Sequence, residues 1–175
     1  MTRDECRALR RTFEPEIAKL LIVAESPSAS GKYFYDPTGA VTDPLFAALM
    51  RQLKCSQTSK EKGLRVFQAS GWVLVDATYS LVSTLSDRKR DAAIARYYPL
   101  LREDLSTLSP DRSASVLLVK ANVCRLLDER LKSDGFRVLN GGRVLYFPSS
   151  CRQKDFHRQF ETIVGDGKCL TRCRN

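Results

Sequence analysis

The sequence is poor in side chains that bind metal ions. It contains one histidine, His157, and its six cysteines lie at positions 6, 55, 124, 151, 169 and 173. Only Cys169 and Cys173 are close together, and their C-x3-C spacing is not the CxxC pair typical of structural zinc and iron–sulfur sites. We therefore expect no metal site.

Motifs of several enzyme classes are also missing. The chain has neither a Walker-type loop nor a G-x-G-x-x-G loop, which argues against nucleotide-dependent enzymes. It has no G-x-S-x-G motif, and a serine triad would depend on His157. We expect no cofactor and no serine-hydrolase chemistry.

Long apolar runs are absent as well. No uninterrupted apolar stretch approaches the roughly 20 residues that a membrane span needs. The N-terminal "MTRDECRALRR" has no apolar core, so it does not resemble a secretory signal. These features predict a cytoplasmic protein with reduced thiols and no membrane partner.

Basic residues, in contrast, are abundant. The chain has 29 lysines and arginines against 20 aspartates and glutamates, a net charge of +9 and a pI near 9.5. This excess favours a polyanionic partner, nucleic acid first, because phosphate neutralisation releases counterions. A basic but indifferent surface is the open alternative, and any binding patch must be assembled by folding.

Apolar strand-like segments alternate with helical ones. Strands are predicted at 19–24, 72–77, 115–120, 137–140 and 143–148; helices at 2–19 with a break near Pro15, 41–53, 55–71, 83–108 with an interruption before Pro99, 121–135 and 150–164. This order predicts an α/β protein, a three-layer α/β/α sandwich around a short, mostly parallel sheet. We expect a single domain over 1–175, with 1–18 as a helical extension and 166–175 as a basic tail.

Chemistry-bearing residues follow several predicted strands. Glu25, Asp76 and Lys120 each stand at or just after the end of an apolar run, and "PSS" at 148–150 follows the last one. Ligands of parallel sheets bind outside the carboxyl ends of the strands. We therefore expect Glu25 and Asp76 to share one cavity.

Two short motifs at opposite ends of the chain resemble those of the uracil-DNA glycosylase superfamily. The first is "AESP" at 24–27, followed by Gly31 and "YFY" at 33–35. The second is "FPSSCRQ" at 147–153, similar to the M-P-S-S or N-P-S-G motif of the thymine and mismatch-uracil branch. The resemblance implies hydrolysis of the N-glycosidic bond of a damaged or deaminated base flipped out of DNA, as in base excision repair. It implies a DNA partner, and neither a cofactor nor an obligate protein partner.

Glu25 is the catalytic candidate that this resemblance gives. A carboxylate there would orient or deprotonate water and stabilise a sugar with cation-like character. Ser26 and Pro27 continue the motif and are expected at the substrate. The alternative for Glu25 is a carboxylate bonded to backbone N–H groups of its own turn.

The aromatic segment supplies the expected stacking surface. Phe34 best matches the position that stacks on the flipped base, with Tyr33 and Tyr35 as alternates. One or two of these rings are expected to pack in the core instead.

Polar residues are expected to recognise the base edge and the DNA backbone. Asp76 stands where uracil-specific relatives carry an amide, and an ionised carboxylate would favour an edge that presents donors. Ser149, Ser150 and Arg152 are expected to contact the backbone, although serines after a proline also cap helices.

The final motif departs from the histidine-containing form, since Phe147 replaces the histidine. Lys32, Lys120, Arg143 and Arg152 are expected to flank the pocket mouth and contact phosphates, with an ordinary surface charge as the alternative for each. Three functions remain open: an active DNA glycosylase, a catalytically inactive module that binds nucleic acid or a modified base, and an α/β scaffold for a protein contact.

Overall fold

The computed structural model describes residues 2–27, 33–56, 58–82 and 84–166. Within these ranges the helices are α1 (Arg3–Arg11), α2 (Pro44–Gln52), α3 (Lys60–Ala69), α4 (Asp87–Leu108), α5 (Ala121–Ser133) and α6 (Gln153–Asp166). The strands are β1 (Leu20–Ala24), β2 (Trp72–Asp76), β3 (Ser115–Leu118) and β4 (Arg137–Val138).

The four strands form one parallel sheet in the order β2-β1-β3-β4. In the pairing of β1 with β2, Leu20 lies opposite Trp72 and Ala24 opposite Asp76. The two strands therefore end together, at the edge where ligands bind in parallel sheets.

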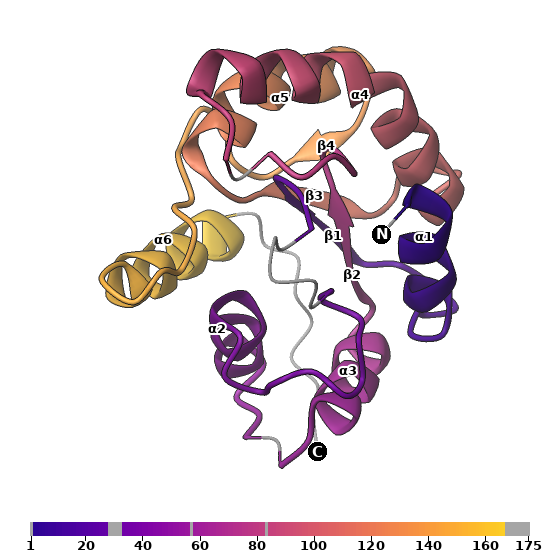
Figure 1. The fold of residues 1–175 in the computed structure, drawn as a ribbon, viewed down its shortest axis with the longest axis vertical. Helices are drawn as coiled ribbons and strands as arrows, with labels where there is room; N and C mark the ends of the chain where they lie inside the picture. The colour runs from indigo at the N-terminus through magenta and orange to yellow at the C-terminus, as the bar shows by residue number, and fades with distance from the viewer. Residues whose placement is uncertain (1, 28–32, 57, 83, 167–175) are drawn as a thin grey trace.

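Helices cover both faces of this sheet (Figure 1). Along β1, Leu20 and Ile22 point into a core built with α2, α3 and α6, whereas Leu21 and Val23 point into a core built with α4 and α5. The strands are apolar along their whole length because both faces are buried. The predicted three-layer α/β/α architecture is confirmed.

The N-terminal helix is shorter than predicted but firmly attached. It ends at Arg11, because the chain turns before Pro15 and does not resume a helix before β1. Three arginines of α1 converge on the buried carboxylate of Asp104 in α4, at 2.9 Å for Arg3, 3.5 Å for Arg7 and 3.8 Å for Arg10. The extension is thus held against the body of the fold through its charges.

Helix α4 runs through Pro99, where a break had been predicted. Proline removes one backbone donor, and its ring crowds the preceding turn. The neighbouring side chains of Tyr98 and Leu101 are buried in the core, however. Their packing on both sides of Pro99 keeps the helix continuous.

The predicted last strand is mostly absent. Residues 143–148 do not pair as a strand, and β4 has only two residues. The side chain of Asn140 takes the place of a strand partner: it accepts from the backbone N–H of Leu118 at 2.8 Å and donates to the carbonyl of Leu118 at 3.0 Å. Gly141 and Gly142, both at positive φ, then turn the chain away.

Among the described residues, no helix is long and apolar enough to cross a membrane. In the same part of the chain, no group of three or more His, Cys, Asp or Glu side chains is placed to hold a metal ion. Most of the predicted basic tail, residues 167–175, lies outside the described residues.

Candidate functional site

A cavity of about 670 Å³ opens at the carboxyl ends of β1 and β2. Its lining includes Glu25, Ser26, Pro27, Tyr33, Phe34, Asp76, Lys120, Phe147, Ser149 and Arg152. The strand ends and the two motifs thus come together around one space, and its size lies within the roughly 300–1,000 Å³ of small-molecule sites. Of the other predicted residues, Ser150 and Arg143 are not in this lining, and Lys32 lies outside the described residues.

Backbone hydrogen bonds continue beyond the strand ends next to Glu25 and Asp76. Ala77 donates its N–H to the carbonyl of Ala24 at 2.8 Å, and Thr78 donates to the carbonyl of Glu25 at 3.0 Å. These bonds continue the parallel ladder past the strand ends. Glu25 and Asp76 therefore enter the cavity from adjacent chains, as the sequence predicts.

Glu25 is held by side chains from the start of α5. Its carboxylate is 8% exposed; Lys120 Nζ contacts Oε2, and Asn122 Nδ2 donates to Oε1 at 2.6 Å. These partners are not the backbone N–H groups of its own turn that the sequence left as an alternative. Glu25 thus links β1 to the N-terminus of α5.

Lys120 has an unusual backbone for a lysine. Its φ is 89°, in a region that non-glycine residues rarely adopt and that costs about 1–3 kcal/mol. Its N–H donates to the carbonyl of Leu145 at 2.7 Å. This conformation sends the chain into α5 directly beside the cavity.

Asp76 has a different environment. It is 2% exposed, and Oδ2 is buried without a hydrogen-bond partner among the described residues. Burial raises the pKa of Asp76 to about 7; Arg10 lowers it and Asp104 raises it further. This differs from the ionised, acceptor-only carboxylate expected from the sequence, because burial favours the neutral form of a carboxyl group.

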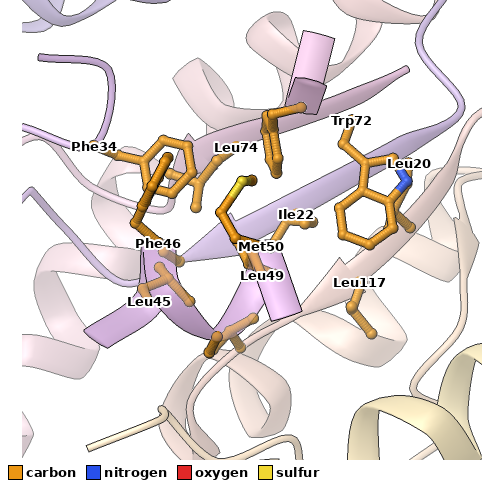
Figure 2. Packing of buried hydrophobic residues seen from close by; sticks show 14 of the residues in the cluster. Leu20, Ile22, Phe34, Leu45, Phe46, Leu49, Met50, Trp72, Leu74 and Leu117 are labelled. Atoms are coloured by element: carbon orange, nitrogen blue, oxygen red, sulfur yellow. The ribbon is translucent and has the colours of Figure 1, made fainter. Parts of the chain in front are cut away.

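The aromatic segment belongs to the core as well as to the cavity wall. Phe34 packs against Tyr35, Phe67 and Phe46, with ring centroids 5.1, 5.3 and 5.8 Å away. Figure 2 shows Phe34 beside Leu74 and Phe46 in this cluster. Phe34 is therefore a partly covered wall of the cavity and not the free stacking platform that the resemblance implies.

Tyr35 fixes the segment onto the edge of the sheet. Its hydroxyl accepts from the N–H of Leu74 at 2.7 Å and donates to the carbonyl of Leu74 at 3.2 Å. β2 is an edge strand, so Tyr35 satisfies backbone groups that no neighbouring strand reaches. Tyr35 and Tyr33 are 0% and 1% exposed, so two of the three rings are almost fully buried, as the sequence allowed.

Lys60 is a residue of this region that the sequence reasoning missed. It is 2% exposed, its ammonium donates to the carbonyl of Tyr33 at 3.2 Å, and it lies 5.5 Å from the ring centroid of Phe46. A lysine in the first turn of a helix opposes the helix dipole, which is the sequence signal that could have marked it. Lys60 ties the aromatic segment to α3.

The second motif forms the rim of the cavity. The guanidinium of Arg152 lies 4.2 Å from the ring centroid of Tyr146, and Phe147 is 38% exposed. Ser149 lines the cavity, and its carbonyl accepts from the N–H of Arg152 at 2.9 Å. This rim presents a cation and two aromatic rings to a ligand that enters.

Two further residues lie elsewhere: Arg143, which was expected at the pocket mouth, and His157, for which no role at the site was expected. Arg143 donates to the carbonyl of Asn140 at 3.1 Å, back toward the glycine turn. The ring of His157 lies 2.7 Å from the amide nitrogen of Gln52 and joins α6 to α2, and burial lowers its pKa. Neither lines the cavity at the strand ends.

No protein-family model matches this sequence, and no curated protein matches it either. The geometry of the cavity and the two short motifs are therefore the basis for assigning a function.

Proposed function

We propose that the protein is a DNA N-glycosylase that hydrolyses the bond between a damaged or deaminated base and its sugar. The observation that carries this proposal is the convergence of Glu25 and Asp76 in one cavity with the aromatic wall and a rim that includes Phe147, Ser149 and Arg152. A flipped base needs a walled slot, and its glycosidic bond needs a carboxylate beside it.

The chemistry falls to Glu25. Each carboxylate oxygen has two lone-pair sites, so the bonds from Lys120 and Asn122 leave further sites for a water molecule. The water adds to the sugar carbon and gives its proton to Glu25, while the base leaves with the electron pair of the glycosidic bond. The negative charge of Glu25 stabilises the cation-like character of the sugar as its bond to the base breaks and its bond to water forms.

The basic residues at the mouth supply the contact with DNA. Lys120 and Arg152 both line the cavity, and in this proposal they contact phosphates that flank an extruded nucleotide. Binding through such contacts weakens as salt is raised, because releasing counterions into a more concentrated salt solution gains less entropy.

A catalytically inactive base-binding module is the second candidate. It is favoured by the engagement of both Glu25 oxygens, since a carboxylate that already serves Lys120 and Asn122 resembles a structural link. In this case the cavity would bind a base without cutting its bond.

The decisive experiment incubates labelled oligonucleotides that carry uracil, hypoxanthine, hydroxymethyluracil or a mismatch, followed by alkali. If the protein is a glycosylase, the treated oligonucleotides break, and Glu25→Ala abolishes this breakage. Glu61→Gln, an exposed control on α3, should give as many strand breaks as the unaltered protein. Salt-sensitive binding without breaks identifies the inactive module. The absence of both strand breaks and binding would contradict both candidates and favour a scaffold.

A further inference from the structure

Two buried polar groups in the cavity wall lack partners. Asp76 Oδ2 and the hydroxyl oxygen of Tyr33 are both buried without a hydrogen-bond partner among the described residues, and both residues line the cavity. Leaving such groups unsatisfied costs about 1–3 kcal/mol each. Their position indicates that a ligand edge completes them.

Asp76 is a residue of this wall whose charge changes near neutral pH. Several ionisable groups face it. They are Cys6 and Arg10 from α1, Tyr33 and Tyr35 from the segment after β1, Tyr79 from the segment after β2, and Asp104 from α4, with Glu25 and Lys120 across the cavity. Burial raises the pKa of Tyr33, Tyr35 and Tyr79 and raises that of Cys6 to about 11, so all four stay neutral.

Arg10 does not hold Asp76 in its ionised form. Its guanidinium lies 2.8 Å from Glu14 and 3.8 Å from Asp104, and it donates to the hydroxyl of Tyr79 at 3.5 Å. Its charge is therefore shared among other acceptors, and no described cation lies within ion-pair distance of Asp76.

The two protonation states of Asp76 suit different ligand edges. A neutral carboxyl group donates one hydrogen bond and accepts another, which matches the adjacent N–H and C=O of a lactam. An ionised carboxylate only accepts, which matches two adjacent donors such as a ring N–H and an exocyclic amino group. A carbonyl placed against the ionised form would meet like charge instead of a donor.

We propose that Asp76 selects the ligand by its protonation: the neutral acid, beside the Tyr33 hydroxyl, takes bases with a lactam edge, and the carboxylate takes bases that present an amino group next to a ring N–H. This inference deepens the proposed function and rests on its assignment of the cavity to a base. It concerns recognition alone, so binding tests it without catalysis.

Inosine and guanosine form a matched pair of probes, because they differ by one exocyclic amino group. Calorimetric titration of the intact protein at about pH 5.5 and about pH 8 spans the transition of Asp76, whose pKa burial raises to about 7. We expect similar affinities for the two nucleosides at the lower pH. At the higher pH the affinity for guanosine should exceed that for inosine by roughly tenfold or more, as one charge-assisted hydrogen bond predicts.

Two variants test the assignment to Asp76. Asp76→Asn fixes an uncharged donor–acceptor pair, so its guanosine-to-inosine ratio should stay the same at both pH values. Tyr33→Phe retains the carboxyl, so the shift should persist while both nucleosides bind more weakly. A circular dichroism spectrum confirms that each variant is folded.

Three results would overturn the inference: a ratio that does not change with pH in the unaltered protein, a change that persists in Asp76→Asn, or no binding of either nucleoside. The glycosylase proposal stands or falls separately. Strand cleavage without a shift in the ratio removes only this inference, and a shift without cleavage removes only the catalytic role.

Discussion

Glu25 and Asp76 are two carboxylates at the ends of adjacent parallel strands, and their surroundings are opposite. Glu25 directly follows Ala24, which pairs with Asp76, so the sheet places the two acids almost level. Glu25 is met by an ammonium and an amide, whereas Asp76 Oδ2 has no hydrogen-bond partner among the described residues. The same functional group is thus bound by two polar side chains at the end of one strand, whereas burial raises its pKa to about 7 on the next.

The neighbouring elements, and not the strands, therefore decide what each acid can do. The start of α5 supplies Lys120 and Asn122 to Glu25. The side chains around Asp76 come from α1, α4, the aromatic segment and the segment after β2, and burial dominates there. Pairs of titratable groups with divergent environments are a usual sign of divided roles in an active site.

The rate of base release should change most, and it should change differently when Glu25 or Asp76 is substituted. Glu25→Gln should reduce base release by about 100-fold or more, the size of effect seen when one stabilising group at a transition state is lost. Asp76→Asn should reduce it less than tenfold for a base with a lactam edge, because the amide imitates the neutral acid. Single-turnover cleavage measures both, and equal losses would erase the division of roles.

The second effect is the dependence of stability on pH that Asp76 imposes. The pKa of Asp76 is raised from 3.8 to about 7 on folding, so the native state binds more protons than the unfolded state between these values. This contribution is fully present below the unfolded pKa and is lost as pH rises to about 7, with a size on the order of a few kcal/mol.

Chemical denaturation of Asp76→Asn and the unaltered protein from about pH 4 to about pH 8 isolates this contribution. The difference in unfolding free energy should move in favour of Asp76→Asn as pH rises. Asp87→Asn, at a side chain that is 99% exposed, is the matched control and should show little change. A difference that is constant with pH would mean that Asp76 is ionised throughout.

The smallest effect concerns the Glu25 side of the cavity. Lys120→Met removes the cation from Glu25, and Lys132→Met removes one from the buried Asp128; both lysines are 33% exposed. Each change should lower the unfolding free energy by about 1 kcal/mol, less at high salt. Only Lys120→Met should also impair base release, and equal cleavage by the two variants would contradict a catalytic pairing of Lys120 with Glu25.

The sequence predicted the shape of the site better than its chemistry. The apolar runs at 19–24 and 72–77 are too short for helices and are followed by turn residues, so the parallel strands and the meeting of Glu25 with Asp76 could be inferred. The hydrogen bond from Asn122 and the neutral form of Asp76 could not, because both depend on side chains that only folding brings near.

Local pattern also fails where the core overrides it. Phe34 matches a stacking position in the motif, but the packing of Phe46 and Phe67 covers much of its ring. Residues 143–148 contain the apolar run "VLYF", but the Asn140 side chain occupies the neighbouring strand's backbone groups. In both cases a contact distant in the sequence decides the outcome.

A pH titration of the Asp76 carboxyl group would test the contrast between the two acids without relying on catalysis. Carbon-13 NMR of protein labelled at aspartate carboxyl carbons follows each group through a pH titration, and Asp76→Asn assigns the signal. We expect one aspartate, absent from that variant, to titrate near its burial-raised pKa of about 7. A signal of Asp76 that titrates at the ordinary aspartate pKa would contradict the contrast between the two acids.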